Sequence, residues 1–534
     1  MASLRDGYPQ EQPDMVGVVE INGVLRPGGT NYADIKINCD EYKQGATGKL
    51  QLDFDFNTLE HDNIRFSGRS VNGEYYPTSV NLGKLELVEQ NAYNGAPVML
   101  TCEDFFDLGE KVSINVAGLE ASVMTKEEAY GAGSGVMRLA AVGGSGSGTG
   151  YTLLRNSWGI YNFGSGFAAN MSGDEVSEGV ARALDQRASD FANATMDDRE
   201  LFRSFMTSGD SSVWRAYANQ LIDDSYARQL AAGMNINHLL SNEARRAALA
   251  GRNDDSKEWQ WFAKPLAFTA RQQGASGYSQ SGNGMLLGAD KQLGSTSFGF
   301  FGGYLHDSTG IRSKNALNTK RDGGFVGAYF NQAKDRQNGA FLYGFARYDN
   351  SNAKSKRQVA LGSYRGTNEA DARQQGGAVE LGTGWNRTTG AGTLSYSAGV
   401  NYTLLQQAGF TENDGRGSAV GLDKGTYRSV LANAGVQYAT TMAPLNKLTD
   451  YSVSVSAMWN QELHRSDRDY SVYFGNNPIP VHWENNEDKG WLDLSLQGQF
   501  VHKKNLAVTA SLGTELFRKN HRGLSGSVKL EYGF

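Results

Sequence analysis

The chain has no long run of apolar residues, and this absence limits how it could cross a membrane. Its mean hydropathy is −0.48, and none of its 534 residues lies in an unbroken apolar segment of the about 18 residues that a transmembrane helix needs. Basic residues are not in excess either, because the formal net charge is −6. Nucleic-acid binding that depends on neutralising phosphates is therefore not expected.

Cysteine and histidine are also scarce. The 2 cysteines, Cys39 and Cys102, either form a disulfide in an oxidising compartment or remain separate thiols, and the sequence leaves both alternatives open. Neither cysteine belongs to a metal-ligand spacing, and no two of the 7 histidines lie within one helical turn of each other. We therefore predict no metal site and no cofactor.

Motifs for catalysis are missing as well. Ser211 lies in a Gly-Asp-Ser-Ser segment that breaks two predicted helices, and His61 is the only histidine ahead of those helices. These residues are too few for a Ser-His-Asp triad. Paired carboxylates such as Asp53 and Asp55 are common on the surfaces of β domains, so they indicate a glycosidase only weakly. The sequence thus predicts no catalytic residues and no enzyme.

What the sequence does contain is a regular rhythm from Trp259 to its end. Strands of alternating apolar and polar residues are joined in turn by short links and by long polar loops. The short links are Gly294–Thr296, Lys334–Gly339, Thr388–Gly392, Ala443–Thr449 and Lys503–Asn505, and the long loops are Gln272–Asn283, Asp307–Lys320, Asp349–Ala370, Thr411–Gly425 and His464–Lys489. Short turns on one side and long loops on the other are typical of outer-membrane β-barrels.

The strands themselves indicate which side chains meet lipid. Because side chains alternate along a strand, we expect one set to face lipid and the other to face the lumen. In the strand near residue 495, the expected lipid-facing set is Leu492, Leu494, Leu496 and Phe500, and the lumen-facing set is Asp493, Ser495, Gln497 and Gln499. Twelve strands can be counted, although Phe341–Tyr348 and Tyr427–Met442 alternate poorly and leave ten or fourteen open.

Upstream of the barrel, the chain divides into further parts. We expect residues 1–142 to form an all-β domain, 143–173 a Gly/Ser-rich connector, 174–236 a helical linker, 237–257 a lumen-spanning helix, and 258–534 the barrel. Apolar residues at helical spacing predict a helix from about residue 174, with Ser172 as its N-cap, and further helices over about 212–232 and 237–251.

The last of these helices carries Arg245 and Arg246 among several alanines, shortly before the first membrane strand. A helix of this composition could thread a polar lumen. Unpaired guanidinium groups would be costly to bury, so we expect both arginines to pair with lumen acids. The candidate acids on the strands are Glu380, Asp493, Glu515 and Glu531.

Three segments carry a resemblance to a known family. They are Gly284–Asp290, the strand Phe298–His306 that follows it, and the closing strand Leu524–Phe534. Over residues 241–534 the chain resembles the C-terminal translocator of autotransporters, the type V secretion proteins. The resemblance implies an all-β transmembrane barrel of 12 antiparallel strands in the bacterial outer membrane, with a helix in its lumen, acting as a monomer in contact with outer-membrane lipid.

The closing strand is the most specific of these segments. One side of it presents Val528, Leu530, Tyr532 and Phe534. An edge strand with unpaired backbone groups invites a partner. The resemblance implies that these residues are an assembly signal, captured by the barrel-assembly machinery after delivery by periplasmic chaperones. Members that cleave their passenger inside the lumen have an Asn-Asn pair in the threading helix, whereas the helical segment here has only the isolated Asn235, Asn237 and Asn242, so self-cleavage there is not expected.

These observations favour an autotransporter whose barrel translocates its own N-terminal passenger and anchors it at the cell surface. The passenger is expected to be a binding or adhesion module with an unidentified extracellular ligand. The alternative is an outer-membrane channel or a lipolytic barrel enzyme. Passengers of this family are often parallel β-helices, although residues 16–142 show no clean repeat. Residues 1–30 do not have the pattern of a signal peptide, which leaves open whether the start was trimmed or the chain is a fragment.

Overall fold

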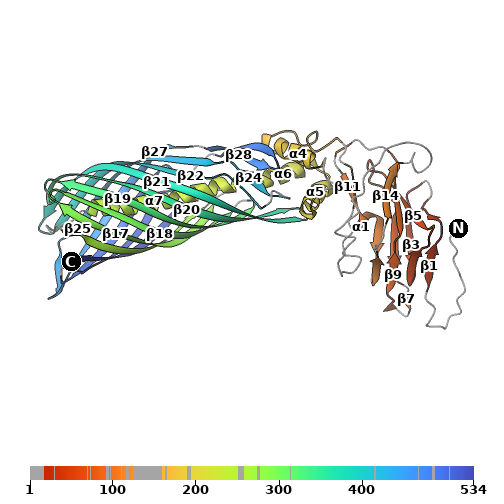
Figure 1. The fold of residues 1–534 in the computed structure, drawn as a ribbon, viewed down its shortest axis with the longest axis horizontal. Helices are drawn as coiled ribbons and strands as arrows, with labels where there is room; N and C mark the ends of the chain where they lie inside the picture. Colours follow the sequence, from red (N-terminus) through yellow and green to blue (C-terminus); the bar gives the residue numbers. More distant parts are fainter. Residues whose placement is uncertain are drawn as a thin grey trace. The chain divides into compact units, whose positions relative to one another are not determined.

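The computed structural model describes residues 17–125 and 159–533, apart from short gaps at 29–30, 69, 72–73, 92–94, 97, 110, 116–119, 163–164, 189–193, 251–257, 274–276, 313, 414–416, 467, 484–487 and 504–505. The Gly/Ser run at 143–150, the end of the predicted lumen helix at 251–257, and Phe534 lie outside the described residues. The chain forms two compact units, Met1–Ala216 and Tyr217–Phe534 (Figure 1). Among the described residues, no helix has both the length and the apolar character needed to span a membrane.

The first unit is built on three parallel sheets. The first sheet contains β3 (Asp34–Asn38), β6 (Asn63–Ser67) and β12 (Phe106–Leu108); the second contains β1 (Val18–Ile21), β4 (Glu41–Gln44), β9 (Thr78–Asn81) and β13 (Val112–Asn115); the third contains β2 (Val24–Leu25), β5 (Lys49–Phe54), β10 (Lys84–Glu89) and β14 (Glu120–Thr125). Successive strands along the chain belong to successive sheets, and neighbours within each sheet are parallel. The unit is therefore a parallel β-solenoid.

Insertions explain why no clean repeat is visible in this part of the sequence. The strands of one sheet begin at residues 34, 63 and 106, which are unequal intervals. The hairpin of β7 (Ser70–Val71) and β8 (Glu74–Tyr75) lengthens one turn of the solenoid. The strand β11 (Val98–Thr101), which pairs with β15 (Gly159–Asn162), and the short helix α1 (Cys102–Phe105) lengthen another. The expected all-β domain is thus confirmed, and its sheets are parallel.

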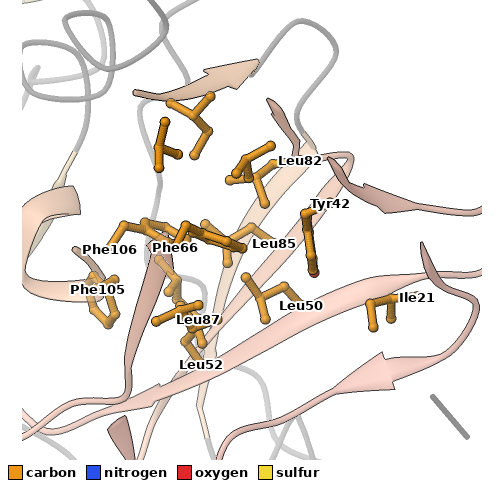
Figure 2. Close-up of a cluster of buried hydrophobic side chains, with 14 of the residues drawn as sticks. Ile21, Tyr42, Leu50, Leu52, Phe66, Leu82, Leu85, Leu87, Phe105 and Phe106 are labelled. Atoms are coloured by element: carbon orange, nitrogen blue, oxygen red, sulfur yellow. The ribbon is translucent and has the colours of Figure 1, made fainter. Parts of the chain in front are cut away.

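The solenoid core is one cluster of apolar side chains from all three sheets (Figure 2). In the register of β5 and β10, Leu85 lies beside Leu50 and Leu87 beside Leu52, and all four are fully buried. Like side chains therefore stack from one turn of the solenoid to the next. Each fully buried leucine contributes about 1.5–3 kcal/mol relative to an exposed one, so this stacking holds the turns together.

Three helices follow the solenoid: α4 (Glu175–Ala188), α5 (Met196–Ser208) and α6 (Ser211–Leu221). The predicted N-cap of α4 is wrong, because Asp174 and not Ser172 accepts the hydrogen bond from the backbone N–H of Ser177, at 2.8 Å. Helix α5, which begins with a capping box between Thr195 and Asp198, was not predicted from the sequence. Such a box normally has Glu or Gln at its third helical position, and aspartate there hid the signal.

The second unit contains a closed antiparallel barrel. Its twelve strands are β16 (Gln260–Gln272), β17 (Tyr278–Leu293), β18 (Thr296–Arg312), β19 (Ala316–Ala333), β20 (Asn338–Leu361), β21 (Tyr364–Thr389), β22 (Gly392–Gln407), β25 (Gly425–Thr440), β27 (Thr449–Arg465), β30 (Gly490–His502), β31 (Leu506–Leu516) and β32 (His521–Gly533). The last strand pairs with the first, and the short β26 (Ala443–Asn446) widens one turn. The predicted count of twelve is confirmed.

An apolar band surrounds the outside of the barrel. On β30 and β27 the large outward side chains, such as Leu496, Phe500 and Val455, are 44–51% exposed. Their neighbours along the strand point inward, as the alternation predicts: Asp493 accepts a hydrogen bond from Asn242 of the lumen helix, at 3.0 Å. Large apolar side chains exposed in a continuous band match a lipid-facing wall.

Inside the barrel, aromatic rings lie over glycines of the neighbouring strand. Tyr343 of β20 is paired in register with Gly382 of β21, and a Cβ placed on Gly382 would overlap the tyrosine ring. Phe301 and Gly327 on β18 and β19 have the same relation. Part of the chain's large glycine content, 66 residues, is thus explained by rings that lie flat against the inner wall.

Two predicted long loops are wrong in their extent. The segment Asp349–Ala370 is a continuation of β20 and β21, which are 24 and 26 residues long and turn at Gly362. The segment Asp307–Lys320 likewise continues β18 and β19. Beyond the apolar band the outward side chains become charged, as at Lys356 and Glu369. Apolar and polar positions no longer alternate clearly there, so the sequence predicts loops where the structure has strands.

Two more of the five predicted long loops, Thr411–Gly425 and His464–Lys489, contribute to a separate small sheet at the same end of the barrel. It consists of β23 (Phe410–Thr411), β24 (Val420–Leu422), β28 (Arg468–Phe474) and β29 (Asn477–Trp483). The long-loop end of the barrel is therefore walled by strand extensions and by this sheet. The strand extensions and this sheet both surround the beginning of helix α7 (Ser225–Ala250).

Candidate functional site: the barrel lumen

The lumen contains one long helix, α7 (Ser225–Ala250), that runs within the barrel (Figure 1). The predicted boundary at residue 237 is wrong: the helix begins at Ser225, and the predicted helix over 212–232 is divided between α6 and α7. The break falls at Asp223 and Asp224, and Asp223 accepts a hydrogen bond from the backbone N–H of Ser225 at 3.2 Å. Aspartate favours this role at a helix start, which the apolar spacing alone did not reveal.

The helix presents an apolar stripe to one half of the barrel wall. Ile236, Leu240, Ala244 and Ala248 recur at every fourth residue and pack against inward-facing side chains of β16 to β21, such as Phe301. This spacing places all four side chains on one face of a helix. The opposite face is polar and turns toward β27 and β30, where Asn242 donates a hydrogen bond to Asp493.

A buried ion pair joins this helix to the wall. Arg245 donates from Nε and Nη2 to the two carboxylate oxygens of Glu380 on β21, at 2.6 and 2.7 Å. Tyr343 and Asn401 also donate to Glu380, at 3.2 and 3.1 Å. Arg245 is 3% and Glu380 4% exposed. Bidentate pairing with further hydrogen bonds is the arrangement that makes a buried charge pair tolerable.

Arg246 is paired differently from the sequence expectation. Its partner is Glu243 on the same helix, at 2.8 Å, and not an acid of the strands. Glu243 also forms an ion pair with Lys264 of β16. The acid is therefore on the helix, and it pairs with one base of the helix, Arg246, and one base of the barrel wall, Lys264. Residues three apart on a helix are close neighbours, and this local partner competes with any acid on the wall.

Hydrogen bonds to the helix backbone add further attachments along its length. Gln280 of β17 donates to the carbonyl oxygen of Ala232 at 3.1 Å, and Arg347 of β20 donates to that of Asn237 at 2.8 Å. Near the end of the helix, Asn331 of β19 donates to the carbonyl oxygen of Ala248 at 2.9 Å. The last carbonyls of a helix have no partner within it, so Asn331 acts as a cap supplied by the wall.

A second buried cluster, which we call the mouth network, holds the first turn of α7 at the long-loop end. It consists of Tyr226, Arg357, Glu412 and Ser418. Arg357 of β20 donates from Nε and Nη2 to both oxygens of Glu412, each at 2.7 Å. The hydroxyl group of Tyr226 on the helix donates to the same carboxylate. Arg357 is 1% and Glu412 0% exposed.

The mouth network extends into the chain on both sides. Arg357 also donates to the carbonyl oxygen of Leu221 at 3.2 Å and to that of Ser418 at 2.8 Å. The side chain of Ser418 accepts hydrogen bonds from Tyr364 and Asn368 of β21, both at 2.9 Å. This network was not predicted from the sequence, because Arg357, Glu412 and Ser418 lie in segments that the sequence predicts to be loops. The continued alternation of β20 toward Leu361 was the one available signal.

Some lumen space remains open. A cavity of about 510 Å³, lined by both polar and apolar side chains, lies beside the C-terminal part of α7, between Arg246, Gln437, Gln497 and the ends of β30 to β32. The helix therefore fills the lumen at the long-loop end more completely than at the short-turn end.

Residues 262–513 match the family model described as the autotransporter beta-domain. The barrel is an autotransporter β-domain. No curated protein matches the chain. Autotransporter barrels are outer-membrane proteins, so the apolar band of this autotransporter domain contacts outer-membrane lipid.

Three solved structures are similar to the chain. They are the translocator domain of the autotransporter NalP from Neisseria meningitidis, with 17% identity over 58% of this chain and 98% of that one and a TM-score of 0.44; the beta domain of the Bordetella autotransporter BrkA, with 18% identity over 51% and 99% and a TM-score of 0.38; and the transport unit of the autotransporter AIDA-I from Escherichia coli, with 15% identity over 53% and 92% and a TM-score of 0.37. Scores this low do not bear on function.

The residues singled out in the closing strand of this autotransporter domain lie on its lipid face. Val528, Leu530 and Tyr532 are 43–47% exposed, whereas Lys529 and Glu531 point inward and form an ion pair. Phe534 lies outside the described residues. The closing strand is paired on both sides, with β31 and with β16, so its edge is not free in the folded barrel.

The residues considered for chemistry lie in the first unit. Ser211 begins α6, and His61 forms an isolated bridge with Phe54 in the solenoid. Asp53 is paired with Arg26 at 2.6 Å, and Asp55 accepts hydrogen bonds from Asn57 at 2.7 and 2.9 Å. Cys39 is a buried free thiol whose pKa is raised to about 11 by burial, while the side chain of Cys102 lies outside the described residues.

Proposed function

We propose that the barrel translocates the N-terminal part of its own chain and afterwards anchors it at the cell surface through α7. The observation that carries this proposal is the double attachment of α7, by Arg245 to Glu380 in the lumen and by Tyr226 to the mouth network. A segment that only passed through the lumen would have no use for two buried, fully hydrogen-bonded charge clusters. Their polar partners fit a permanent tether instead.

The same attachments argue against the alternative of an open channel. A helix whose apolar stripe packs on β16 to β21 and whose polar face is bonded to β30 obstructs the lumen. A cavity of about 510 Å³ lies beside the C-terminal part of the helix, from Glu243 to Ala250. A lipolytic barrel has no support either, because Ser211 and His61 both belong to the first unit.

The placement of α7 can be tested by cross-linking. Asn242→Cys and Asp493→Cys, introduced together with Cys39→Ser and Cys102→Ser, should form a disulfide on mild oxidation, because the native side chains are within 3.0 Å. The matched control combines Asn242→Cys with Leu496→Cys, which faces lipid and should not cross-link. Equal cross-linking of both pairs would contradict the lumen placement.

The sealing function can be tested by conductance in planar bilayers. The full chain should conduct poorly, and deletion of residues 225–250 should raise the single-molecule conductance many-fold. A full chain that already conducts like the deletion variant would favour the channel alternative.

We infer that the first unit is displayed outside the cell as a binding or adhesion module. Parallel sheets with one continuous core keep their outer faces free for contacts, and solenoids commonly use such faces for recognition. Protease added to intact cells should then digest the solenoid and leave the barrel, whereas protection of the solenoid until the cells are broken would contradict surface display.

We infer further that Val528, Leu530, Tyr532 and Phe534 act as the assembly signal for the barrel-assembly machinery and periplasmic chaperones. Deletion of Phe534 should abolish outer-membrane insertion while synthesis continues, measured by the yield of heat-modifiable barrel in membranes. Tyr532→Phe, which keeps an aromatic side chain, serves as the control and should insert normally. Unchanged membrane yield after the deletion would contradict the signal.

A further inference from the structure

The lipid-facing wall is hollowed where the first and last strands meet. A groove of about 790 Å³ opens there. Large apolar side chains, exposed by 38–59%, form its sides: Trp261, Leu287, Phe300, Val326, Leu506, Leu530 and Tyr532. Between them lie two small residues, Ala263 and Gly302. The seam therefore has a recess in an otherwise bulky apolar wall.

The strand register explains this recess. Leu530, Ala263, Leu287, Gly302 and Val326 lie side by side on five neighbouring strands, so large and small side chains alternate across the wall. A Cβ placed on Gly302 would meet its nearest atom, the carbonyl oxygen of Phe325, at 3.3 Å. That contact is tight, so the backbone must shift by a few tenths of an ångström before a larger side chain at this position can extend into the recess.

A cation and a tryptophan stand beside this groove at the short-turn end. Nζ of Lys291 lies 5.8 Å from the ring centroid of Trp259, and that ring lies 5.5 Å from Phe300, which forms part of the groove's side. Lys291 has no carboxylate partner within the part of the chain that the structure describes. It is located two residues along β17 from Ala289 and four from Leu287, toward the turn at Gly294.

We propose that this seam binds one phospholipid, with its phosphate at Lys291 and its acyl chains in the groove. Lys291 lies at a depth that suits a lipid headgroup, because it is four residues from Leu287 and four residues of a strand span roughly 13 Å. The lysine is therefore nearer to the membrane surface than the groove is. Tryptophan is enriched at the level of lipid headgroups, and an ammonium group attracts a phosphate. Assignment to the periplasmic leaflet, and hence to a phospholipid instead of lipopolysaccharide, rests on the proposed orientation of the barrel.

The proposal can be tested by native mass spectrometry of the purified full chain, released from nanodiscs of palmitoyl-oleoyl phosphatidylethanolamine. The wild-type protein should retain one phospholipid under conditions that strip the rest. Gly302→Leu, which fills the recess, and Lys291→Glu, which repels the phosphate, should each lose it. The matched controls are Ala398→Leu, at another exposed lipid-facing position of β22, and Arg387→Glu, a charge reversal near the same end of β21; both should retain it.

The outcomes separate the possibilities. Loss of the lipid in Gly302→Leu and Lys291→Glu alone supports the site. Equal retention in all five proteins, or no retained lipid in the wild type, would overturn it. Preferential retention of lipopolysaccharide from mixed nanodiscs would overturn the choice of phospholipid. Failure of the proposed secretion function would appear instead in the cross-linking and conductance measurements, which none of these four substitutions touches.

Discussion

At the scale of single residues, the lumen of this autotransporter domain depends on charges that are neutralised in pairs. Arg245 and Glu380 are almost completely buried from water. Arg357 and Glu412 are equally buried at the long-loop end of the barrel. Such pairs gain little over an apolar substitute, because desolvation offsets their attraction, but removing one partner leaves a buried charge without compensation. The two kinds of substitution should therefore differ strongly.

We predict that Glu380→Gln lowers the free energy of unfolding of the barrel by about 3–5 kcal/mol, because Arg245 then remains buried without its counter-ion. The double variant Arg245→Met, Glu380→Met should lose much less. Urea midpoints of the heat-modifiable band on gels provide the measurement. Lys356→Ala removes an exposed pair with Glu369 and should cost less than about 1 kcal/mol; equal losses in all three variants would exclude the pairing argument.

The solenoid contains a residue whose charge depends on pH in an unusual range. Asp62 is fully buried, and burial raises its pKa to about 6 although the backbone N–H groups of Ala33 and Asp53 donate to it at 2.9 and 2.8 Å. Because the folded-state pKa is above the unfolded value of about 4, its contribution to stability is complete below pH 4. This contribution is lost as the pH rises through 6.

We therefore predict that the stability difference between the wild type and Asp62→Asn changes between pH 4 and pH 7, in favour of Asn at the higher pH. Hydrogen exchange of solenoid amides in the full chain measures it. Other carboxyl groups titrate in both proteins, so their effects cancel in the difference. A difference that stays constant with pH would show that Asp62 titrates normally.

At this scale the sequence identified Arg245 and included Glu380 among its possible partners, since both stand at positions that alternation or helical spacing assigns to the lumen. It could not choose among four acids, because the rotation of the helix relative to the wall is set by packing of Ile236, Leu240, Ala244 and Ala248. It also missed Glu412, because a carboxylate in a loop-like segment has no periodic neighbours that reveal its burial.

At the scale of elements, the alternation of the strands was sufficient to predict the barrel. Most strands have two chemically different faces where they cross the apolar band, and the count of twelve rests on that contrast, although the inward Phe341, Tyr343 and Phe345 of β20 are apolar as well. The prediction failed where β20 and β21 extend beyond the band, because their outward faces are polar there and their inward faces mix polar residues with apolar ones such as Val359 and Leu361. The solenoid was not predicted from the sequence for another reason, because its insertions change the number of residues between equivalent strands.

The two faces of β30 can be compared directly with adjacent residues. Leu496→Arg, near the middle of the strand on the lipid face, should cost roughly 2–4 kcal/mol, whereas Gln497→Arg points into the polar cavity beside α7 and should cost much less. Refolding into phospholipid vesicles followed by urea titration gives both values. If the two variants unfold at the same urea concentration, the assignment of faces is wrong.

At the scale of the whole molecule, the solenoid and the barrel have separate cores. The solenoid depends on a single apolar cluster, whereas every strand of the barrel is paired on both sides. We predict that urea unfolds the full chain in two transitions, with the solenoid first, as expected for a chain with independent units. Loss of circular dichroism in a first step, with the barrel still heat-modifiable on gels, would show it; a single coincident transition would contradict it.

The pairing of Trp261 with Tyr532 also constrains the order of events in time. The first strand of the barrel cannot acquire its second neighbour until β32 has been synthesised. Folding that depends on contacts so distant in sequence is slow. The barrel therefore remains unclosed until β32 pairs, and substitutions that delay this pairing will lengthen that interval without changing the finished structure.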